Sequence, residues 1–309
     1  MTLAMILTIV AAIFYAIASH IDKYLISKAV KNANYRSLIL VSTIIAGGMM
    51  TPIYLFICNF SVDFDFPSIA ILFVNSILCT IANILWYKAL SRDDTTIITI
   101  MLQLIPVFVL LLSPLFLPDQ NITLVQLIGG SIITLSAIFI TYEPTKKKVA
   151  KSRSVTLGLM AIVSILYAIW FILIRYVNID HDFNRTVFWS NLTLFVVGII
   201  MFISLSSYRK SFNKTLKTNG PKVIGLNLVN ELLNSFAGIF TTLAETMVPV
   251  ALVSFASSGI EPFMVMAIGI MLTKFLPKTE KENITKKAII KRAISIALCL
   301  IGLACIEFG

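Results

Sequence analysis

The stretch from Thr95 to Leu117 reads TTIITIMLQLIPVFVLLLSPLFL and contains no charged side chain. A transmembrane helix needs about 20 predominantly apolar residues to cross the hydrocarbon core of a bilayer. Only helices and closed barrels satisfy their backbone hydrogen bonds in lipid, and barrel strands alternate apolar with polar residues. This stretch is continuously apolar, so it predicts a transmembrane α-helix.

Similar apolar stretches continue on both sides of this one. Of the 309 residues, 58% are hydrophobic and only 13% are charged, whereas soluble domains average about 45–50% apolar and about 25% charged residues. We therefore predict an all-α integral membrane protein with ten transmembrane helices and no inserted soluble domain. The predicted spans are residues 3–22, 36–58, 67–88, 95–117, 122–141, 156–176, 185–205, 223–243, 247–273 and 288–306.

The positions of the basic residues predict the orientation of these spans. Of the 25 Lys and Arg residues, 23 lie in the odd-numbered connections or at their edges. Cytoplasmic loops carry the excess of Lys and Arg, so the odd-numbered loops should be cytoplasmic and both termini extracytoplasmic. We expect a multi-pass protein of the cell membrane. Lys291 and Arg292, at the edge of the last span, are expected to snorkel to the interface.

The same distribution accounts for the net charge of +10 without nucleic acid as a partner. The four cysteines form no CxxC motif, so we expect neither a metal site nor a disulfide framework. HExxH motifs, nucleophile elbows and phosphate-binding glycine loops do not occur in the sequence, so we expect no cofactor and no enzymatic activity. The expected partners are the lipid bilayer and a small-molecule substrate, and the chain could be a monomer or a homodimer.

Short motifs recur in the same order in the two halves of the chain, 152 to 156 residues apart. They are Tyr15-Ala16-Ile17 with Tyr167-Ala168-Ile169, Asn75 with Asn230, and Pro106 with Pro262. We predict a first five-helix repeat over residues 1–143, a basic cytoplasmic linker over 144–155 and a second five-helix repeat over 156–309. Because five is odd, the second repeat must be inverted, and inverted repeats are typical of secondary transporters with a site near mid-membrane.

Three further motifs carry a family resemblance. Ala89-Leu90-Ser91, Gln103 to Phe108 and Gln126 to Gly130 resemble the EamA domain of the drug/metabolite transporter superfamily, and Gly259 to Phe263 occupies the equivalent place in the second half. The sequence departs from the family at residues 117–120, where members often carry a Gly-Glu pair. The resemblance implies a ten-helix metabolite transporter, but it does not name the substrate.

Polar side chains follow single faces of several predicted spans. Residues at i, i+3, i+4 and i+7 share a helix face, and polar residues inside a membrane usually face the bundle interior. We interpret these faces as the wall of a hydrated cavity, with hydrogen-bonded contacts between helices as the alternative. The candidate substrate-binding residues are Tyr15, Asn75, Asn83, Gln103, Tyr167, Asn230, Asn234 and Ser258.

Glu231 and Glu261 are the acidic residues that lie well inside predicted spans. Each is a candidate for proton coupling or for the counter-charge of a cationic substrate, with a neutral, hydrogen-bonded acid as the alternative. Pro106 and Pro262 fall within predicted helices, where proline removes a backbone hydrogen bond, and they are candidate hinges or static kinks. Trp86, Tyr87 and Trp189 lie near predicted helix ends, which favours an interfacial aromatic belt over a cation-binding cage.

These features lead to one main hypothesis. The chain is expected to be a secondary active transporter of a small polar or cationic metabolite, coupled to protons or to exchange and working by alternating access. A lipid-handling protein, a membrane scaffold and a passive channel remain alternatives.

Overall fold

The computed structural model describes residues 2–29, 35–116, 123–141, 147–247, 250–276 and 282–308, and all regular structure within these ranges is helical. The helices are α1 (Thr2–Tyr24), the short π-helix η1 (Leu25–Ala29), α2 (Tyr35–Ile57), α3 (Phe66–Leu90), α4 (Thr95–Leu102), α5 (Leu104–Phe116), α6 (Leu124–Thr141), α7 (Lys147–Val177), α8 (Phe183–Ser204), α9 (Ser206–Met247), α10 (Val250–Phe275) and α11 (Lys286–Phe308).

Among the described residues, eight helical stretches are long and apolar enough to cross a membrane. They lie in α1, α2, α3, the α4–α5 pair, α7, α8, α9 and α11, and a shorter apolar stretch, Leu124–Ile140, lies in α6. The predicted span 247–273 falls on α10, whose side chains at 250–259 lie outside the described part of the chain. The chain is therefore a multi-pass, all-α integral membrane protein.

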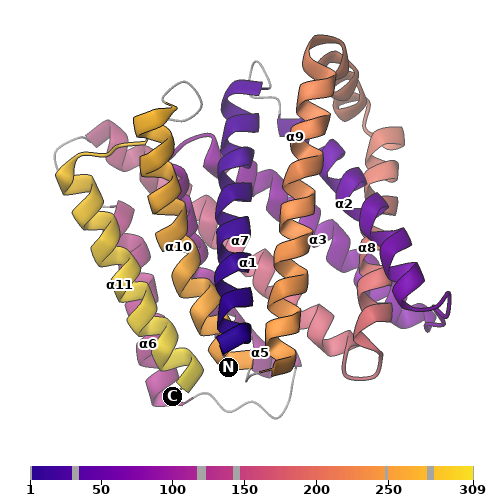
Figure 1. Ribbon diagram of the computed structural model, residues 1–309, viewed down its shortest axis with the longest axis horizontal. Helices are drawn as coiled ribbons and strands as arrows, with labels where there is room; N and C mark the ends of the chain where they lie inside the picture. The colour runs from indigo at the N-terminus through magenta and orange to yellow at the C-terminus, as the bar shows by residue number, and fades with distance from the viewer. Residues whose placement is uncertain are drawn as a thin grey trace.

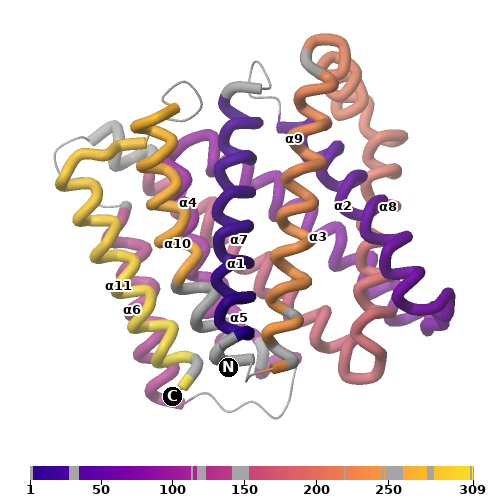
Figure 2. Tube along the Cα trace, viewed as in Figure 1, coloured from indigo at the N-terminus to yellow at the C-terminus, as the bar shows by residue number. Residues whose placement is uncertain are grey.

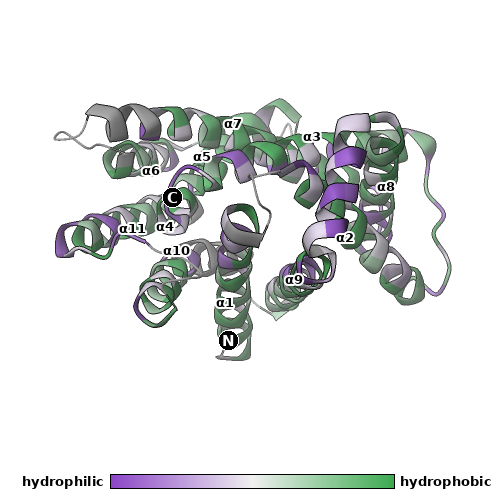
Figure 3. Ribbon diagram, turned by 90° about the horizontal axis from the view of Figure 1, so that it is seen from above, coloured by the Kyte–Doolittle hydropathy of each residue, from purple (hydrophilic) through white to green (hydrophobic). Residues whose placement is uncertain are grey.

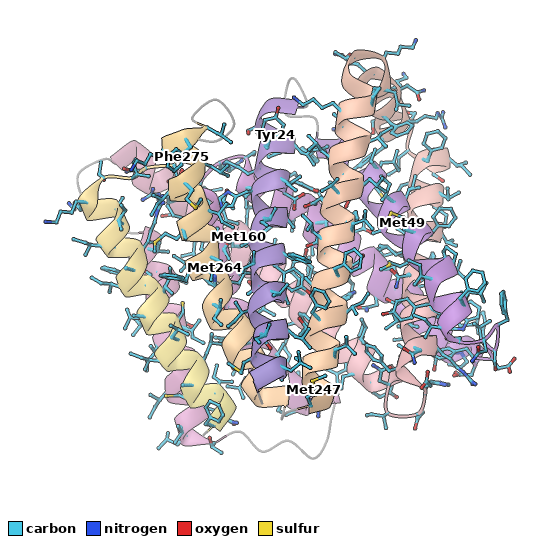
Figure 4. The ribbon with its side chains drawn as sticks, in the orientation of Figure 1. Tyr24, Met49, Met160, Met247, Met264 and Phe275 are labelled. Atoms are coloured by element: carbon cyan, nitrogen blue, oxygen red, sulfur yellow. The ribbon has the colours of Figure 1, made fainter. Side chains whose placement is uncertain are left out.

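The helices run up and down between the two ends of the bundle. Both chain termini lie at the same end in Figure 1, and Figure 2 shows α1 running from that end to the opposite one. Figure 4 shows Tyr24 and Phe275, near the ends of α1 and α10, at the end away from the termini, whereas Met247 at the end of α9 lies beside the N-terminus. Helix α9 is thus antiparallel to both α1 and α10.

Seen from above, the helices form two facing rows. Figure 3 shows α6, α7 and α3 in one row, α10, α1 and α9 in the other, and α2 with α8 at one edge. Helix α1 packs against α9 and α10, and α3 packs against α7 and α8. Helix α2 packs against α8, and α6 packs against α11. The first-half helices therefore contact mainly second-half helices.

Glycine allows a close approach where α2 crosses α8. A Cβ atom added at Gly47 would lie 2.6 Å from both the Asn191 carbonyl oxygen and the Phe195 nitrogen. A Cβ atom added at Gly198 would lie 2.8 Å from Cγ1 of Ile44. Small residues let helix backbones approach in this way in membranes.

Several helix boundaries differ from the sequence predictions. The predicted span 95–117 is divided into α4 and α5 at Gln103, because Pro106 cannot donate to the carbonyl group four residues earlier and so interrupts the helix there. Pro106 consequently sits in the first turn of α5, where an N–H group would have no intrahelical partner. Pro262 lies inside α10, which continues past it.

Two predicted basic loops are partly helical. Helix α9 begins at Ser206, about five turns before the predicted span, so the basic stretch from Arg209 to Lys222 is helical. Phe212 packs on Phe202 of α8 and Thr215 donates to Ser37 of α2, which anchors this extension. Helix α7 begins at Lys147, so the described part of the predicted linker 144–155 belongs to that helix.

Candidate functional site

A group of hydrogen-bonded polar side chains is buried where α1, α3 and α9 meet. Asp22, near the end of α1, accepts a hydrogen bond from the Tyr87 hydroxyl at 2.8 Å and from Nδ2 of Asn230 at 2.9 Å. The Trp86 side chain also hydrogen-bonds Asp22. Asn230 is 1% exposed and Tyr87 is 3% exposed, whereas Asp22 itself is half-buried.

A second carboxyl group lies beside this group. Glu231 follows Asn230 on α9, is 9% exposed, and accepts a hydrogen bond from the Ser42 hydroxyl of α2. Within the described ranges, no lysine or arginine lies within ion-pair distance of either Asp22 or Glu231. A buried acid without a basic partner is stable only when it is protonated or when a cation balances it.

The α3–α7 contact holds a further pair of predicted site residues. The Tyr167 hydroxyl donates to Oδ1 of Asn83 at 2.6 Å, and Asn83 in turn donates to the Cys79 sulfur at 3.7 Å. Asn75 lies earlier on α3, and its side chain donates to the Trp170 backbone carbonyl at 3.4 Å. The structure therefore brings Asn75, Asn83 and Tyr167 together at the contact between α3 and α7.

Several buried amide atoms are left without hydrogen-bond partners. They are both polar atoms of the Asn227 side chain, Oδ1 of Asn230 and Oδ1 of Asn75. Asn227 and Asn75 are fully buried. Nearly all buried polar groups in native proteins have a partner, and each exception calls for an explanation such as a ligand or water. Asn227 and Asn230 lie on α9 with Glu231, so their free atoms can serve a polar ligand there.

The remaining predicted residues are distributed more widely. Tyr15 of α1 points towards α9, with its hydroxyl 3.8 Å from the position of a Cβ atom at Gly238, and Gln103 is buried at the break between α4 and α5. Asn234 and Glu261 are half-buried on α9 and α10. Among the described residues, neither hydrogen-bonded group includes them, and the Ser258 side chain lies outside the described part of the chain.

Two expectations about aromatic and basic residues are wrong. Trp86 and Tyr87 are not part of an interfacial belt, because both are buried and bond Asp22. Arg292 does not snorkel, because it is 1% exposed and pairs with two acids. Asp22 lies on α1, whereas Trp86 and Tyr87 lie on α3. Periodicity relates residues within one helix, so sequence patterns alone could not group these three.

Arg292 of α11 organises a buried ion-pair cluster at the end of the bundle away from the termini. Its Nη1 atom lies 2.5 Å from Oε2 of Glu282, and its Nη2 atom binds Oδ2 of Asp94. Glu282 accepts from the backbone N–H and the hydroxyl of Thr96, in the first turn of α4, at 3.1 and 2.8 Å. Burial raises the pKa of Glu282, and the Arg292 guanidinium opposes this shift. The cluster ties α4 to α11.

Neighbouring basic residues close the same end. Nζ of Lys23 donates to the Leu90 and Asp93 carbonyl oxygens at 2.5 and 2.6 Å, so it caps the end of α3. Nε of Arg153, on α7, lies 3.1 Å from Oδ2 of Asp93. Burial raises the pKa of Asp93, and Arg153 counteracts this effect. The ends of α1, α3 and α7 are thus held together by charged contacts.

Comparisons with known proteins identify the fold and the family. One solved structure, described only as a crystal structure of a protein, superposes with a TM-score of 0.55 and 13% sequence identity, and the match covers 98% of this chain and 95% of the other. At that identity the likeness shows the fold alone. A search of curated proteins found no match.

The model of the EamA-like transporter family matches residues 2–142. These residues contain α1 to α6 and therefore Asp22, Tyr87 and the Tyr167-bonded Asn83. The resemblance that the sequence motifs indicated is confirmed by this match. Residues 2–142 are therefore an EamA domain, the domain of the drug/metabolite transporter superfamily that the sequence motifs indicated.

Proposed function

We propose that this protein is a secondary active transporter of a small organic cation, coupled to protons or to exchange. The observation that carries the proposal is a pair of carboxyl groups, half-buried Asp22 and buried Glu231, which lack basic partners among the described residues. A cationic substrate would supply the missing charge. The unpartnered amide atoms of Asn227 and Asn230 would bind its polar groups.

The transport mechanism that we propose is alternating access between two inverted five-helix repeats, residues 1–143 and 156–309, within ten spans. The α2–α8 crossing supports the repeat. Gly47 approaches Phe195 and Gly198 approaches Ile44, while Gly47 to Gly198 and Ile44 to Phe195 are both separated by 151 residues. Such reciprocal contacts are expected where a two-fold axis relates two copies of one unit.

A second pair of contacts supports the same axis. Tyr167 of α7 reaches Asn83 of α3, and Tyr15 of α1 reaches Gly238 of α9. The tyrosines are 152 residues apart, and Asn83 and Gly238 are 155 apart, close to the spacing of the sequence motifs. The two halves therefore differ at this position. The first half has the amide side chain of Asn83, and the second half has Gly238, whose side chain is a hydrogen atom. Such a difference would let one binding site sit between two similar halves.

The ion-pair cluster of Arg292, Glu282 and Asp94 fits the closed side of such a transporter. It joins α4 of the first repeat to α11 and the connection before it in the second repeat. If the odd-numbered loops are cytoplasmic, this cluster closes the cytoplasmic side. Opening towards the cytoplasm would then require these contacts to separate, with the α4–α5 break near Pro106 as one candidate hinge and Pro262 as another.

Uptake into proteoliposomes tests the proposal. We would measure choline as a cationic probe, glutamine as a zwitterion and glucose as a neutral solute, each with and without an imposed pH gradient. The proposal predicts that the cation accumulates above its external concentration and that the gradient, or internal cation for exchange, drives this accumulation. A passive channel would equilibrate the probe without a pH-driven or exchange-driven gain.

Conservative variants test the two carboxyl groups. Asp22→Asn and Glu231→Gln keep an acceptor for Asn230 and Ser42 but remove the charge. A hydrogen bond to a charged group contributes about 1.5–3 kcal/mol, so each variant should reduce cation uptake by about 10- to 100-fold. Asp63→Asn, in the exposed α2–α3 connection, is the matched control. Normal uptake and an unchanged pH profile in both variants would rule out the counter-charge and coupling roles.

A further inference from the structure

An apolar groove lies on the outside of the bundle between α3 and α8, away from the polar group. It has a volume of about 260 Å³ and is lined by Ile77, Ile81 and Ile84 of α3 and by Val197 and Ile200 of α8. Ile77, Ile81 and Ile200 are 39%, 41% and 46% exposed, so the groove opens towards the surrounding lipid. An empty groove would forfeit dispersion contacts along its wall, and a hydrocarbon chain fits this lining.

One end of the groove is polar and basic. The groove ends at Leu205 and Tyr208, where α8 passes into α9. Nζ of Lys88 lies 5.4 Å from the centre of the Tyr35 ring, and the next residue, Arg36, acts electrostatically on Tyr208. Arg36 is exposed, and Lys88 and Tyr208 are half-exposed. Two cationic side chains and a hydroxyl group therefore gather at this end.

No acidic residue balances this charge on the elements that form the groove. The sequences of α2, α3 and α8, and of α9 as far as Asn230, contain no Asp or Glu. Arg209 caps the end of α8 by donating to the Phe202 and Ile203 carbonyl oxygens at 3.4 and 2.8 Å, which adds a further positive charge. The head of the groove is complementary to an anion, whereas its length is complementary to hydrocarbon.

We propose that this groove binds an anionic phospholipid, with one acyl chain between α3 and α8 and the phosphate bound by Arg36, Lys88 and the Tyr208 hydroxyl. Basic residues at the ends of transmembrane helices lie at the level of lipid head groups, which places the phosphate at the basic end of the groove. The site is separate from Asp22 and Glu231, so it does not depend on the transport proposal. Its lining is apolar, which fits a stationary lipid rather than a path for moving head groups.

Native mass spectrometry of the full-length protein in detergent tests this site. The protein would be titrated with phosphatidylglycerol and with phosphatidylcholine of the same acyl chains. The proposal predicts one tightly retained phosphatidylglycerol and at least tenfold weaker binding of phosphatidylcholine. Equal retention of the two lipids would overturn the proposal, and so would a dimer that excludes lipid, because the groove would then be an interface between two copies.

Two pairs of substitutions separate a built site from general surface charge. Each basic residue near a membrane surface contributes about fivefold to the binding of an anionic lipid, so Arg36→Gln with Lys88→Gln should weaken phosphatidylglycerol binding about 25-fold. Lys214→Gln with Lys217→Gln changes the net charge equally on an exposed face of α9 and should leave binding within about twofold. An equal loss in both pairs would overturn the proposal.

A third variant tests the groove itself. Ile81→Trp would fill the space between α3 and α8 while leaving the basic residues in place, and its exposure to lipid allows the larger side chain. Binding of phosphatidylglycerol should fall at least tenfold. Unchanged binding in this variant would overturn the acyl-chain part of the proposal, and an unchanged melting temperature would show that the fold is retained.

Discussion

Replacing Arg292 with methionine should strongly destabilise the protein. The arginine is 1% exposed and holds Glu282, which is equally buried, and Asp94, which is 22% exposed. Removing one member of a buried ion pair costs about 3–5 kcal/mol, because the other charge is left in a low-dielectric environment. Glu282 keeps its two hydrogen bonds from Thr96 and Asp94 is partly accessible to water, so we expect about 3 kcal/mol, the lower end of this range.

Reversible unfolding in mixed detergent–SDS micelles, followed by tryptophan fluorescence, measures this loss. Lys291→Met is the matched control, since it removes the neighbouring cation of the same helix, whose Nζ donates to the Ile140 carbonyl oxygen at 3.0 Å. The double variant Arg292→Met with Glu282→Gln should recover part of the loss, because it removes the orphaned carboxylate. A loss below about 1 kcal/mol for Arg292→Met, the value of a surface ion pair, would refute the argument.

Two further outcomes follow from the same structure. Gly47→Ala should destabilise the protein more than Gly198→Ala. The new Cβ atom at position 47 would meet backbone atoms of α8 at 2.6 Å, whereas the one at position 198 would meet the more adaptable Ile44 side chain at 2.8 Å. Equal losses in the same unfolding assay would contradict this. The Arg292→Met variant should lose stability as pH rises above the ordinary pKa of a glutamate. Burial raises the pKa of Glu282 in the folded state, so that state still binds a proton that the unfolded chain has released. Melting temperatures that rise with pH, relative to wild type, would contradict this.

The membrane character of this protein could be predicted from composition and from uninterrupted apolar stretches. This prediction succeeds because the length of an apolar helix is set by the thickness of the bilayer, which is a local constraint along the chain. The exact helix ends were less predictable. The extension of α9 back to Ser206 depends on Phe212 packing against α8 and on Thr215 bonding α2, and neither contact leaves a signal in the local sequence.

The candidate site was predicted in part. Periodicity along single helices found Asn230, Glu231 and Asn83, and the internal repeat singled out Tyr167. The structure places Asn230 and Glu231 next to a second carboxyl group and joins Asn83 directly to Tyr167. It missed Ser42, and it did not give Asp22 a role in the site, although Asp22 bonds residues from two other helices. Hydrogen bonds between helices depend on their relative rotation and height, which one helix's sequence does not encode.

The sequence by itself determined that the chain is an all-α membrane protein with motifs of the EamA family, because hydrophobic length and composition act residue by residue. Only the tertiary structure decided which polar groups share one site and which basic residues are buried. Arg292 illustrates the reason: in the sequence it is one cation at the edge of a span, and in the fold it is paired with Glu282 and Asp94. Those acids reach it from a connection ten residues earlier and from α4, so only packing brings the three together.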